Sequence, residues 1–300
     1  MKVAVCGQKD IAIRCTKILR EKNVEIVFVT PNSSDTGIDS WQPSFRKWAE
    51  TVGLSIVDSK PEELQKAVNE NNIELLFSIY YDKILKRELI DMLPLGIVNT
   101  HLSLLPRYRG IAPITFAILN GEDKHGVSLH YIDEGIDRGD IIAQTNFDIR
   151  DLNANEAFLL ATAKCVELFS ENIDSILKGE NKRIKQDNSN ALYYSNTSID
   201  WLKGHIVKNN SVFFNKDTRS IYNWIRAFIF PPLQYPLVTL DGIEYEIHRA
   251  EPVYEFNIFE KPGKIIEIKE NNENFTIALI ATHDCYIRLI LWRINSAADE

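Results

Sequence analysis

The sequence predicts an α/β protein, with a Rossmann-like, mostly parallel sheet in a first domain and a small OB-like β-barrel in a second. In the first half, short apolar runs alternate with segments of helical periodicity, which is typical of parallel strands joined by right-handed crossovers. After Leu237, short alternating runs are separated by turn sequences at Asp241–Gly242 and Pro262–Gly263, which indicates β-structure. The 300 residues suffice for two modest domains. We therefore expect a first, α/β domain at residues 1–200 and a barrel at residues 201–300.

The expected elements of the first domain follow the chain in order. Pro61 suits the first turn of a helix, and the two glutamates after it suit the positive end of the helix dipole. Apolar runs predict buried strands at residues 2–6, 24–30, 54–57, 73–79 and 96–99, and helical spacing predicts helices at about 11–21, 44–52 and from 61 onward.

The second half of the chain continues with mixed elements. Asn153 and Glu156 have the spacing of a capping box at the start of a long helix, which ends at Gly179. The polar stretch 179–190 is interpreted as a linker. A helix is expected at about 112–120, and strands are expected at 127–131, 141–147, 243–247, 265–268, 275–281 and 286–292.

Charge and cysteine content restrict the class of protein. The chain has 34 basic and 42 acidic side chains, a net charge of −8, which argues against a nucleic-acid partner. The four cysteines are scattered in apolar surroundings, as expected for buried thiols in a reducing compartment. The first apolar run is too short for a signal peptide, and no run reaches membrane-spanning length. We therefore expect a cytoplasmic protein without a membrane partner.

Polar side chains of three kinds gather where the fifth predicted strand ends. Asn99 and His101 stand two residues apart, so extended backbone points both to one side. Asp137 follows on a turn with glycines on both sides. Together they could perform general acid–base chemistry and stabilise an oxyanion. Taken singly, His101 could be a satisfied polar group and Asp137 a turn residue, and Asp140 is a rival carboxylate.

Two other kinds of site are not expected. His125 and His130 are five residues apart on one predicted strand and so lie on opposite faces, which makes shared metal ligation improbable, and we expect no metal. After the first strand, Gly7 stands where a dinucleotide fold would carry three glycines, and two of them are absent.

The stretch around Asn99 resembles the formyltransferases that use 10-formyltetrahydrofolate. Their pattern is Asn-x-His-x-Ser-Leu-Leu-Pro, then Arg-Gly and later Gly-x-Asp-x-Gly, and it is present here at residues 99–106, 109–110 and 135–139. The resemblance implies that Asn99, His101 and Asp137 are catalytic: His101 takes the proton of the attacking amine, Asn99 stabilises the oxyanion, and Asp137 orients His101. It places the pterin of the folate cosubstrate along a loop that includes Tyr80, Tyr81, Ile84 and Leu85.

Within this family, the sequence is most similar to the nucleotide-sugar N-formyltransferases. The resemblance includes Tyr108–Gly110, the helix end at 120–122, and the segments 225–228 and 230–232. The stretch Trp41–Ser44 is similar to enzymes that act on dTDP-4-amino-4,6-dideoxyglucose. That acceptor implies a bacterial enzyme of O-antigen and lipopolysaccharide synthesis. The segments 199–201 and 225–228 resemble the family's link between domains.

The predicted contacts with a dTDP-sugar are less specific. Arg226, Lys83 and Lys9 would meet the diphosphate, because cationic groups suit phosphate. Tyr222 or Trp224 would face the base, although packing roles are as compatible with these residues. Two residues of the family motif, Ser103 and Arg109, complete the expected substrate site. An exposed apolar barrel face could form a homodimer.

Three alternatives remain at the level of sequence. A methionyl-tRNA formyltransferase would need a basic surface, but the loop 31–43 has no Lys or Arg, and residues 201–300 carry eleven basic against thirteen acidic side chains. A non-catalytic module that binds folate or nucleotide would not need Asn99, His101 and Asp137 together. A formyltetrahydrofolate hydrolase would act without an amine.

Overall fold

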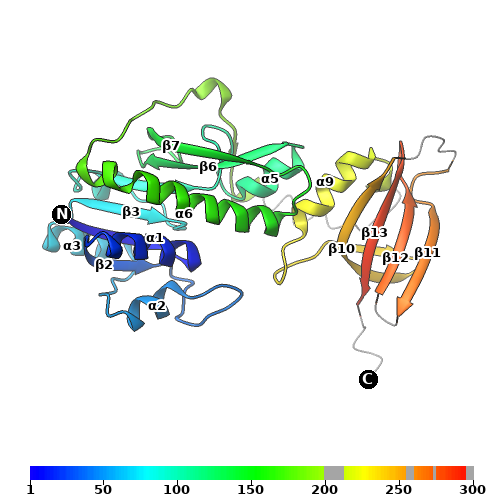
Figure 1. Cartoon of the computed structure of the whole chain (residues 1–300), viewed down its shortest axis with the longest axis horizontal. Helices are drawn as coiled ribbons and strands as arrows, with labels where there is room; N and C mark the ends of the chain where they lie inside the picture. The colour runs from blue at the N-terminus through cyan, green and yellow to red at the C-terminus, as the bar shows by residue number, and fades with distance from the viewer. Residues whose placement is uncertain (199–212, 255–259, 273–274, 295–300) are drawn as a thin grey trace. The chain divides into compact units, whose positions relative to one another are not determined.

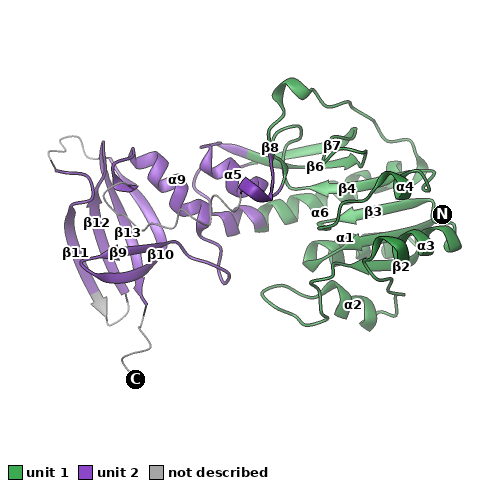
Figure 2. Cartoon of the chain, turned by 180° about the vertical axis from the view of Figure 1, so that it is seen from behind, with its two compact units in different colours: residues 1–110, 125–147, 159–193 green, residues 111–124, 148–158, 194–300 purple. Residues whose placement is uncertain are grey.

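A computed structural model describes residues 1–198, 213–254, 260–272 and 275–294 of the chain. The chain forms two compact units (Figure 2). Unit 1 comprises residues 1–110, 125–147 and 159–193, and unit 2 comprises residues 111–124, 148–158 and 194–300. The predicted domain boundary at residue 200 and the predicted link 199–201 lie outside the described residues.

Unit 1 is built on a six-stranded sheet with the order β2-β1-β3-β4-β6-β7 (Figure 1). The first four of these strands are parallel, and β6 pairs antiparallel with β4. The predicted Rossmann-like, mostly parallel sheet is thus confirmed. The strands are β1 (Lys2–Gly7), β2 (Glu25–Pro31), β3 (Leu75–Ile79), β4 (Ile97–His101), β6 (Lys124–Tyr131) and β7 (Ile141–Asp148).

Helices cover both faces of this sheet. Helix α6 packs on one face, where Phe169 meets Phe77 of β3 edge to face at 5.3 Å between ring centroids. On the other face, Leu64 and Val68 of α3 and Leu89 of α4 share one core with apolar side chains of β1, β2, β3 and β4. The helices are α1 (Lys9–Glu21), α2 (Phe45–Thr51), α3 (Pro61–Asn71), α4 (Arg87–Ile90) and α6 (Ala154–Lys178).

Unit 2 holds a curled, five-stranded antiparallel sheet with the order β11-β12-β13-β10-β9 (Figure 1). Its inner face packs in one core with side chains of α9. This sheet agrees with the small barrel-like domain that the sequence predicts. The elements are α5 (Pro113–Leu119), α9 (Thr218–Phe228), β9 (Leu237–Leu240), β10 (Ile243–Val253), β11 (Ile265–Asn272), β12 (Phe275–Ala281) and β13 (Tyr286–Arg293).

Local signals in the sequence set the ends of α6. Asn153 and Glu156 bond reciprocally, since each backbone N–H donates to the other's side chain, at 2.8 and 2.9 Å, and the predicted capping box is confirmed. The helix ends where Gly179 adopts a φ of +69°, a conformation that glycine adopts at little cost. No helix among the described residues is long and apolar enough to cross a membrane.

Two predictions about unit 1 are wrong. Residues 54–57 form no strand, and only Ile56 makes an isolated bridge, to Val29. The stretch 179–190 is not a free linker, because Ile184 exchanges two backbone hydrogen bonds with Ile141, at 2.8 and 2.9 Å. A short strand that follows it, β8 (Tyr193–Tyr194), pairs with β5 (Arg109–Gly110). Polarity predicted exposure there, but the pairing depends on residues far away in the sequence.

Candidate active site

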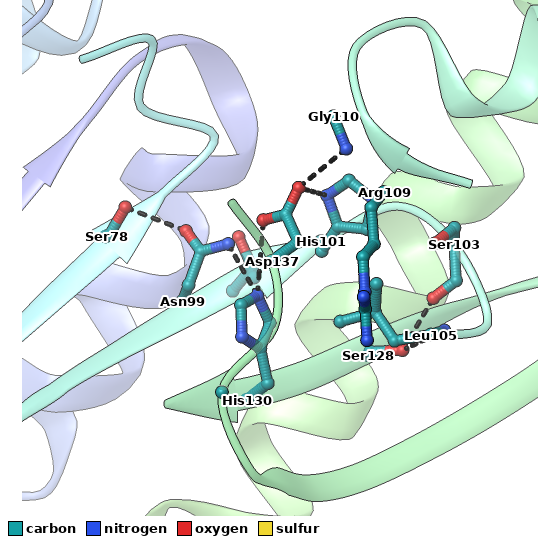
Figure 3. Close-up of polar contacts among 12 residues, drawn as sticks. Ser78, Asn99, His101, Ser103, Leu105, Arg109, Gly110, Ser128, His130 and Asp137 are labelled. Carbon is teal, nitrogen blue, oxygen red and sulfur yellow. Dashed lines mark hydrogen bonds and ion pairs between the residues drawn. The ribbon is translucent and has the colours of Figure 1, made fainter. Parts of the chain in front are cut away.

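The carboxyl end of β4 presents Asn99 and His101 on one face of the sheet (Figure 3). The Asn99 side chain is fixed at both ends. Its Oδ1 accepts a hydrogen bond from Ser78 Oγ at 2.8 Å, and its Nδ2 lies 2.9 Å from Nε2 of His130. The amide orientation is therefore set by β3 on one side and by β6 on the other.

The surroundings of His101 determine which ring nitrogen carries the hydrogen. Nε2 lies 2.8 Å from the backbone oxygen of Tyr108, and a carbonyl oxygen can only accept. Nε2 therefore donates, and in the neutral ring the lone pair is on Nδ1. Nδ1 faces Asp137 Oδ2 at 3.5 Å. A proton that arrives on Nδ1 would be stabilised by this carboxylate.

Asp137 lies between two imidazole rings in Figure 3. Its Oδ2 faces His101 and accepts from the backbone N–H of Gly110 at 2.8 Å, and its Oδ1 lies 3.5 Å from Nε2 of His130. Asp137 has a φ of +52°, in the left-handed region. Gly139 two residues later has no room for a side chain, since a Cβ there would lie 1.9 Å from the Tyr131 oxygen.

Electrostatics keep this carboxyl group ionised. Burial alone would raise the pKa of Asp137. The charge of His101 and the N–H of Gly110 are among the influences that outweigh burial and hold this pKa well below its usual range. Asp140, the rival carboxylate, instead faces Lys185 at 3.8 Å.

His130 is a site residue that the sequence analysis missed. It is 1% exposed, and its Nδ1 donates to the backbone oxygen of Tyr131 at 2.8 Å. Its Nε2 can then accept from Asn99. The antiparallel register pairs His130 with Asn99 across β4 and β6. A sequence reading that pairs these strands could have found it, since cross-strand partners share a face.

Lys9 lies at the start of α1 against two aromatic rings. Its ammonium group is 4.6 Å from the ring centroid of Trp41 and 5.4 Å from that of Tyr80. Burial lowers the pKa of Lys9 and raises the pKa of Tyr80 to about 12. The N–H of Tyr80, just after β3, is 3.3 Å from Thr100 Oγ1, which ties this cluster to β4.

The other predicted folate contacts differ in exposure. Ile84 is 75% exposed, whereas Leu85 is 7% exposed and belongs to the core shared with α3 and α4. The ring of Tyr81 packs against the same core. The exposed Lys83 lies 3.8 Å from its neighbour Asp82. Leu85 therefore anchors the loop in the core rather than lining an open surface.

Ser103 and Arg109 are held inside unit 1. Ser103 is fully buried, and its Oγ donates to the Arg107 oxygen at 2.7 Å. Arg109 is 6% exposed and donates to the side chains of Gln186 and Asn188, at 2.7 to 3.1 Å. These hydrogen bonds tie both side chains to the protein, and their direct contacts with substrate stay predictions.

The predicted contacts in α9 lie in the interior of unit 2. Arg226 is 2% exposed, and Nη1 donates to the backbone oxygens of Ile149 and Leu152 at 2.6 and 2.8 Å. Burial, the largest influence, lowers its pKa to about 10. Tyr222 is 9% exposed, and Trp224 packs on neighbouring aromatic rings. The contacts of all three side chains are those of structural residues. Arg226 holds the segment 149–152, which precedes α6.

An amide, an imidazole and an ionised carboxylate thus converge at one edge of the sheet. Such a group can accept a proton and stabilise negative charge on an oxygen. Among the residues that the structure describes, no group of three or more His, Cys, Asp or Glu side chains is placed to hold a metal ion.

Known proteins share this architecture. WlaRD, a sugar 3N-formyl transferase solved in the presence of dTDP and 5-N-formyl-THF, has 30% identity, covers 99% of this chain and 98% of its own, and superimposes with a TM-score of 0.76. An N-formyltransferase from Helicobacter canadensis, solved with folinic acid and dTDP-3-aminofucose, has 28% identity and a TM-score of 0.78, and the match covers 98% of this chain and 100% of that one.

Sequence comparison also finds formyltransferases. A methionyl-tRNA formyltransferase from Staphylococcus aureus (strain N315) is 28% identical over 291 residues, which are 93% of this chain and 90% of that protein. Residues 1–164, which contain Asn99, His101 and Asp137, match the profile described as formyl transferase. The chain therefore belongs to the formyl transferase family of enzymes.

Proposed function

We propose that this protein transfers the formyl group of 10-formyltetrahydrofolate to the amine of a dTDP-linked amino-dideoxy sugar. The observation that carries the proposal is the convergence of Asn99, His101 and the ionised Asp137. The two solved relatives described above were crystallised with formylated folates and with dTDP or a dTDP-sugar.

The geometry supports a division of labour for the chemistry. As the amine nitrogen attacks the formyl carbon, Nδ1 of His101 takes its proton, and Asp137 stabilises the resulting imidazolium at 3.5 Å. The formyl oxygen gains negative charge. One N–H of Asn99 goes to His130, and the second is positioned to donate to this oxygen. When the bond between the formyl carbon and the folate nitrogen breaks, His101 returns the proton to that nitrogen.

The nucleotide end of the acceptor fits the cluster of Lys9, Trp41 and Tyr80. An ammonium group held by two rings offers a charge to a diphosphate and a face to a base. Lys9 also begins α1, where backbone N–H groups favour an anion. Nearby, Asn32 is fully buried and its Nδ2 has no partner among the described residues, so a polar ligand would satisfy it.

The position of the amine has two candidates. The segment Trp41–Ser44 favours dTDP-4-amino-4,6-dideoxyglucose. The relative with 30% identity is a 3N-formyl transferase, and the one with 28% identity was solved with dTDP-3-aminofucose, which favours a 3-amino sugar. We place the 3-amino sugar first, because this similarity extends over nearly the whole chain. Either product suits a bacterial, cytoplasmic step towards O-antigen.

Methionyl-tRNA is the second candidate acceptor, because the curated relative from Staphylococcus aureus is named for it. The charge of the chain argues against this acceptor. The loop between β2 and α2 has no Lys or Arg from Pro31 to Pro43, and the chain carries a net charge of −8. Binding to a polyanion needs clustered positive charge.

The test measures tetrahydrofolate release from 10-formyltetrahydrofolate with separate acceptors. These are dTDP-3-aminofucose, dTDP-4-amino-4,6-dideoxyglucose, UDP-4-amino-arabinose, methionyl-tRNA and no amine. We expect turnover with a dTDP-sugar and a fall in kcat of about 10²- to 10⁴-fold in His101→Asn. His283→Asn, a variant of the half of the chain without the site, is the matched control. Turnover with methionyl-tRNA alone, or without any amine, would refute the proposal.

A further inference from the structure

We propose that Gln186 is a positioning residue that holds Asp137 in the geometry needed for formyl transfer. The inference rests on the proposed roles of Asp137 and His101. It arises from the segment 184–192, here called the strap, most of which lies in the stretch 179–190 that the sequence analysis interpreted as a linker. The strap lies about fifty residues beyond the Asp137 loop in the sequence, yet its side chains contact that loop.

The side-chain amide of Gln186 bonds the Asp137 loop on both sides of Arg138. Its Nε2 donates to the backbone oxygens of Asp137 and Gly139, at 2.9 and 2.8 Å. Both hydrogens of the amide nitrogen are thereby used. Two carbonyl groups that are two residues apart are thus held by a single group, which fixes the path of the backbone between them.

The same side chain connects the loop to β5. Gln186 Oε1 accepts from Nε and Nη2 of Arg109, at 3.1 and 2.7 Å. Arg109 precedes Gly110, whose N–H donates to Asp137 Oδ2 at 2.8 Å. Gln186 therefore secures the backbone of Asp137 directly and the partner of its carboxylate indirectly.

The Asp137 loop needs such support. A φ of +52° is less favourable for an aspartate than the right-handed region and persists where surrounding contacts impose it. Residues 137–140 are Asp, Arg, Gly and Asp, so this part of the loop has no apolar side chain that could pack into the core. Hydrogen bonds from outside the loop must then maintain its conformation.

The strap itself is held by backbone contacts and does not depend on Gln186. Ile184 exchanges two hydrogen bonds with Ile141, and at the other end the Arg109 N–H donates to the Leu192 oxygen at 2.8 Å. Before the strap, the Arg183 guanidinium lies 3.6 Å from the Tyr131 ring centroid. Removal of the Gln186 amide should therefore leave the strap in place and release only the loop.

The first experiment needs no acceptor. Limited digestion with trypsin measures the initial rate of cleavage at the Arg138–Gly139 bond, which lies between the two held carbonyl groups. We expect Gln186→Leu to raise that rate by about tenfold or more, because two hydrogen bonds that close the loop are lost. Ser189→Ala, which removes an exposed hydroxyl of the same strap, should match the wild type. Cleavage after Arg150 provides an internal reference.

The second experiment separates positioning from general stability. Gln186→Leu should lower kcat by about 10- to 100-fold with KM within about threefold, as expected when a reacting group is misplaced. In an Asp137→Asn background the same change should lower kcat by less than about threefold, because both changes disrupt the same group of interacting residues. Gln186→Glu keeps an acceptor for Arg109 but loses the donors, and it should behave like Gln186→Leu.

The outcomes test the positioning role of Gln186 separately from the proposed function of the protein. Unchanged cleavage at Arg138 in Gln186→Leu, or a full additional loss of kcat in the Asp137→Asn background, would overturn the positioning role. A rise in KM alone would also overturn it. If the wild type formylates no acceptor, the proposed function fails, whereas the cleavage rates still show whether Gln186 holds the loop.

Discussion

At the scale of single residues, the central feature is one carboxylate shared by two imidazole rings. Asp137 meets His101 through Oδ2 and His130 through Oδ1, each at 3.5 Å. The two rings have different tasks, because His130 accepts from Asn99 while Nδ1 of His101 is left to receive a proton. In the proposed mechanism, this single carboxylate contacts both the base, His101, and the ring that orients the Asn99 amide, His130.

The lowered pKa of Asp137 makes stability depend on pH. In the unfolded chain an aspartate titrates near about 3.9. Because the native pKa is lower, the carboxylate contributes its full stability above the unfolded pKa, and this contribution is lost as pH falls through the native pKa. The difference in unfolding free energy between wild type and Asp137→Asn should therefore be largest near pH 7 and shrink below about pH 5. Urea denaturation at pH 7, 4 and 3 measures it, and a constant difference would contradict the assignment.

His130 should affect the rate through Asn99. His130→Phe removes the acceptor of the Asn99 Nδ2 hydrogen, so the amide can turn away from the formyl oxygen. We expect kcat to fall by about 10- to 100-fold, less than the roughly 10²- to 10³-fold that follows loss of an oxyanion donor itself, because the Asn99 amide is still present. His130→Gln retains an acceptor oxygen and should recover part of the rate. Steady-state kinetics of both variants, with melting temperatures as a control, would test this, and equal losses would argue for packing alone.

At the scale of elements, helix ends and buried side chains stabilise unit 2. The first turn of α6 is capped by Asn153, which accepts from the Glu156 N–H at 2.9 Å. Asn153→Ala should lower the unfolding free energy by about 1 kcal/mol, the usual contribution of such a cap, and leave kcat unchanged. Chemical denaturation measures the loss. Asn190→Ala, at an exposed position, is the control.

Arg226 makes a contrasting prediction. Its guanidinium satisfies the oxygens of Ile149 and Leu152 and the side chain of Asn223. Arg226→Met keeps the apolar stem but leaves these acceptors unsatisfied, which should cost about 3 kcal/mol or more. KM for a dTDP-sugar should change little in the fraction that remains folded. A large rise in KM without loss of stability would restore the diphosphate contact that the sequence suggested.

At the scale of the whole molecule, the sequence predicted the features that depend on residues close together in the chain. Period-two and helical spacing located most strands and helices, and the Asn153–Glu156 cap and the end of α6 at Gly179 followed from short-range chemistry. The family motif located Asn99, His101 and Asp137, which the fold then brought together.

What the sequence could not predict depends on pairing between distant segments. His130 joins the site because β6 pairs with β4, and Gln186 reaches Asp137 because the strap pairs with β5 and β7. Arg226 was expected at the diphosphate of a substrate, but it is buried on backbone oxygens supplied by another segment of the chain. Composition does not reveal such partners.

The order of synthesis gives the strap a further consequence. A nascent chain that has emerged from the ribosome as far as residue 180 already contains Asn99, His101 and Asp137, but it lacks the glutamine amide that fixes the last of them. The profile match, residues 1–164, ends short of that point as well. If Gln186 has the role proposed above, the Asp137 loop is completed only after residue 186 has emerged, and a product truncated before the strap should present the family motif without an ordered Asp137 loop.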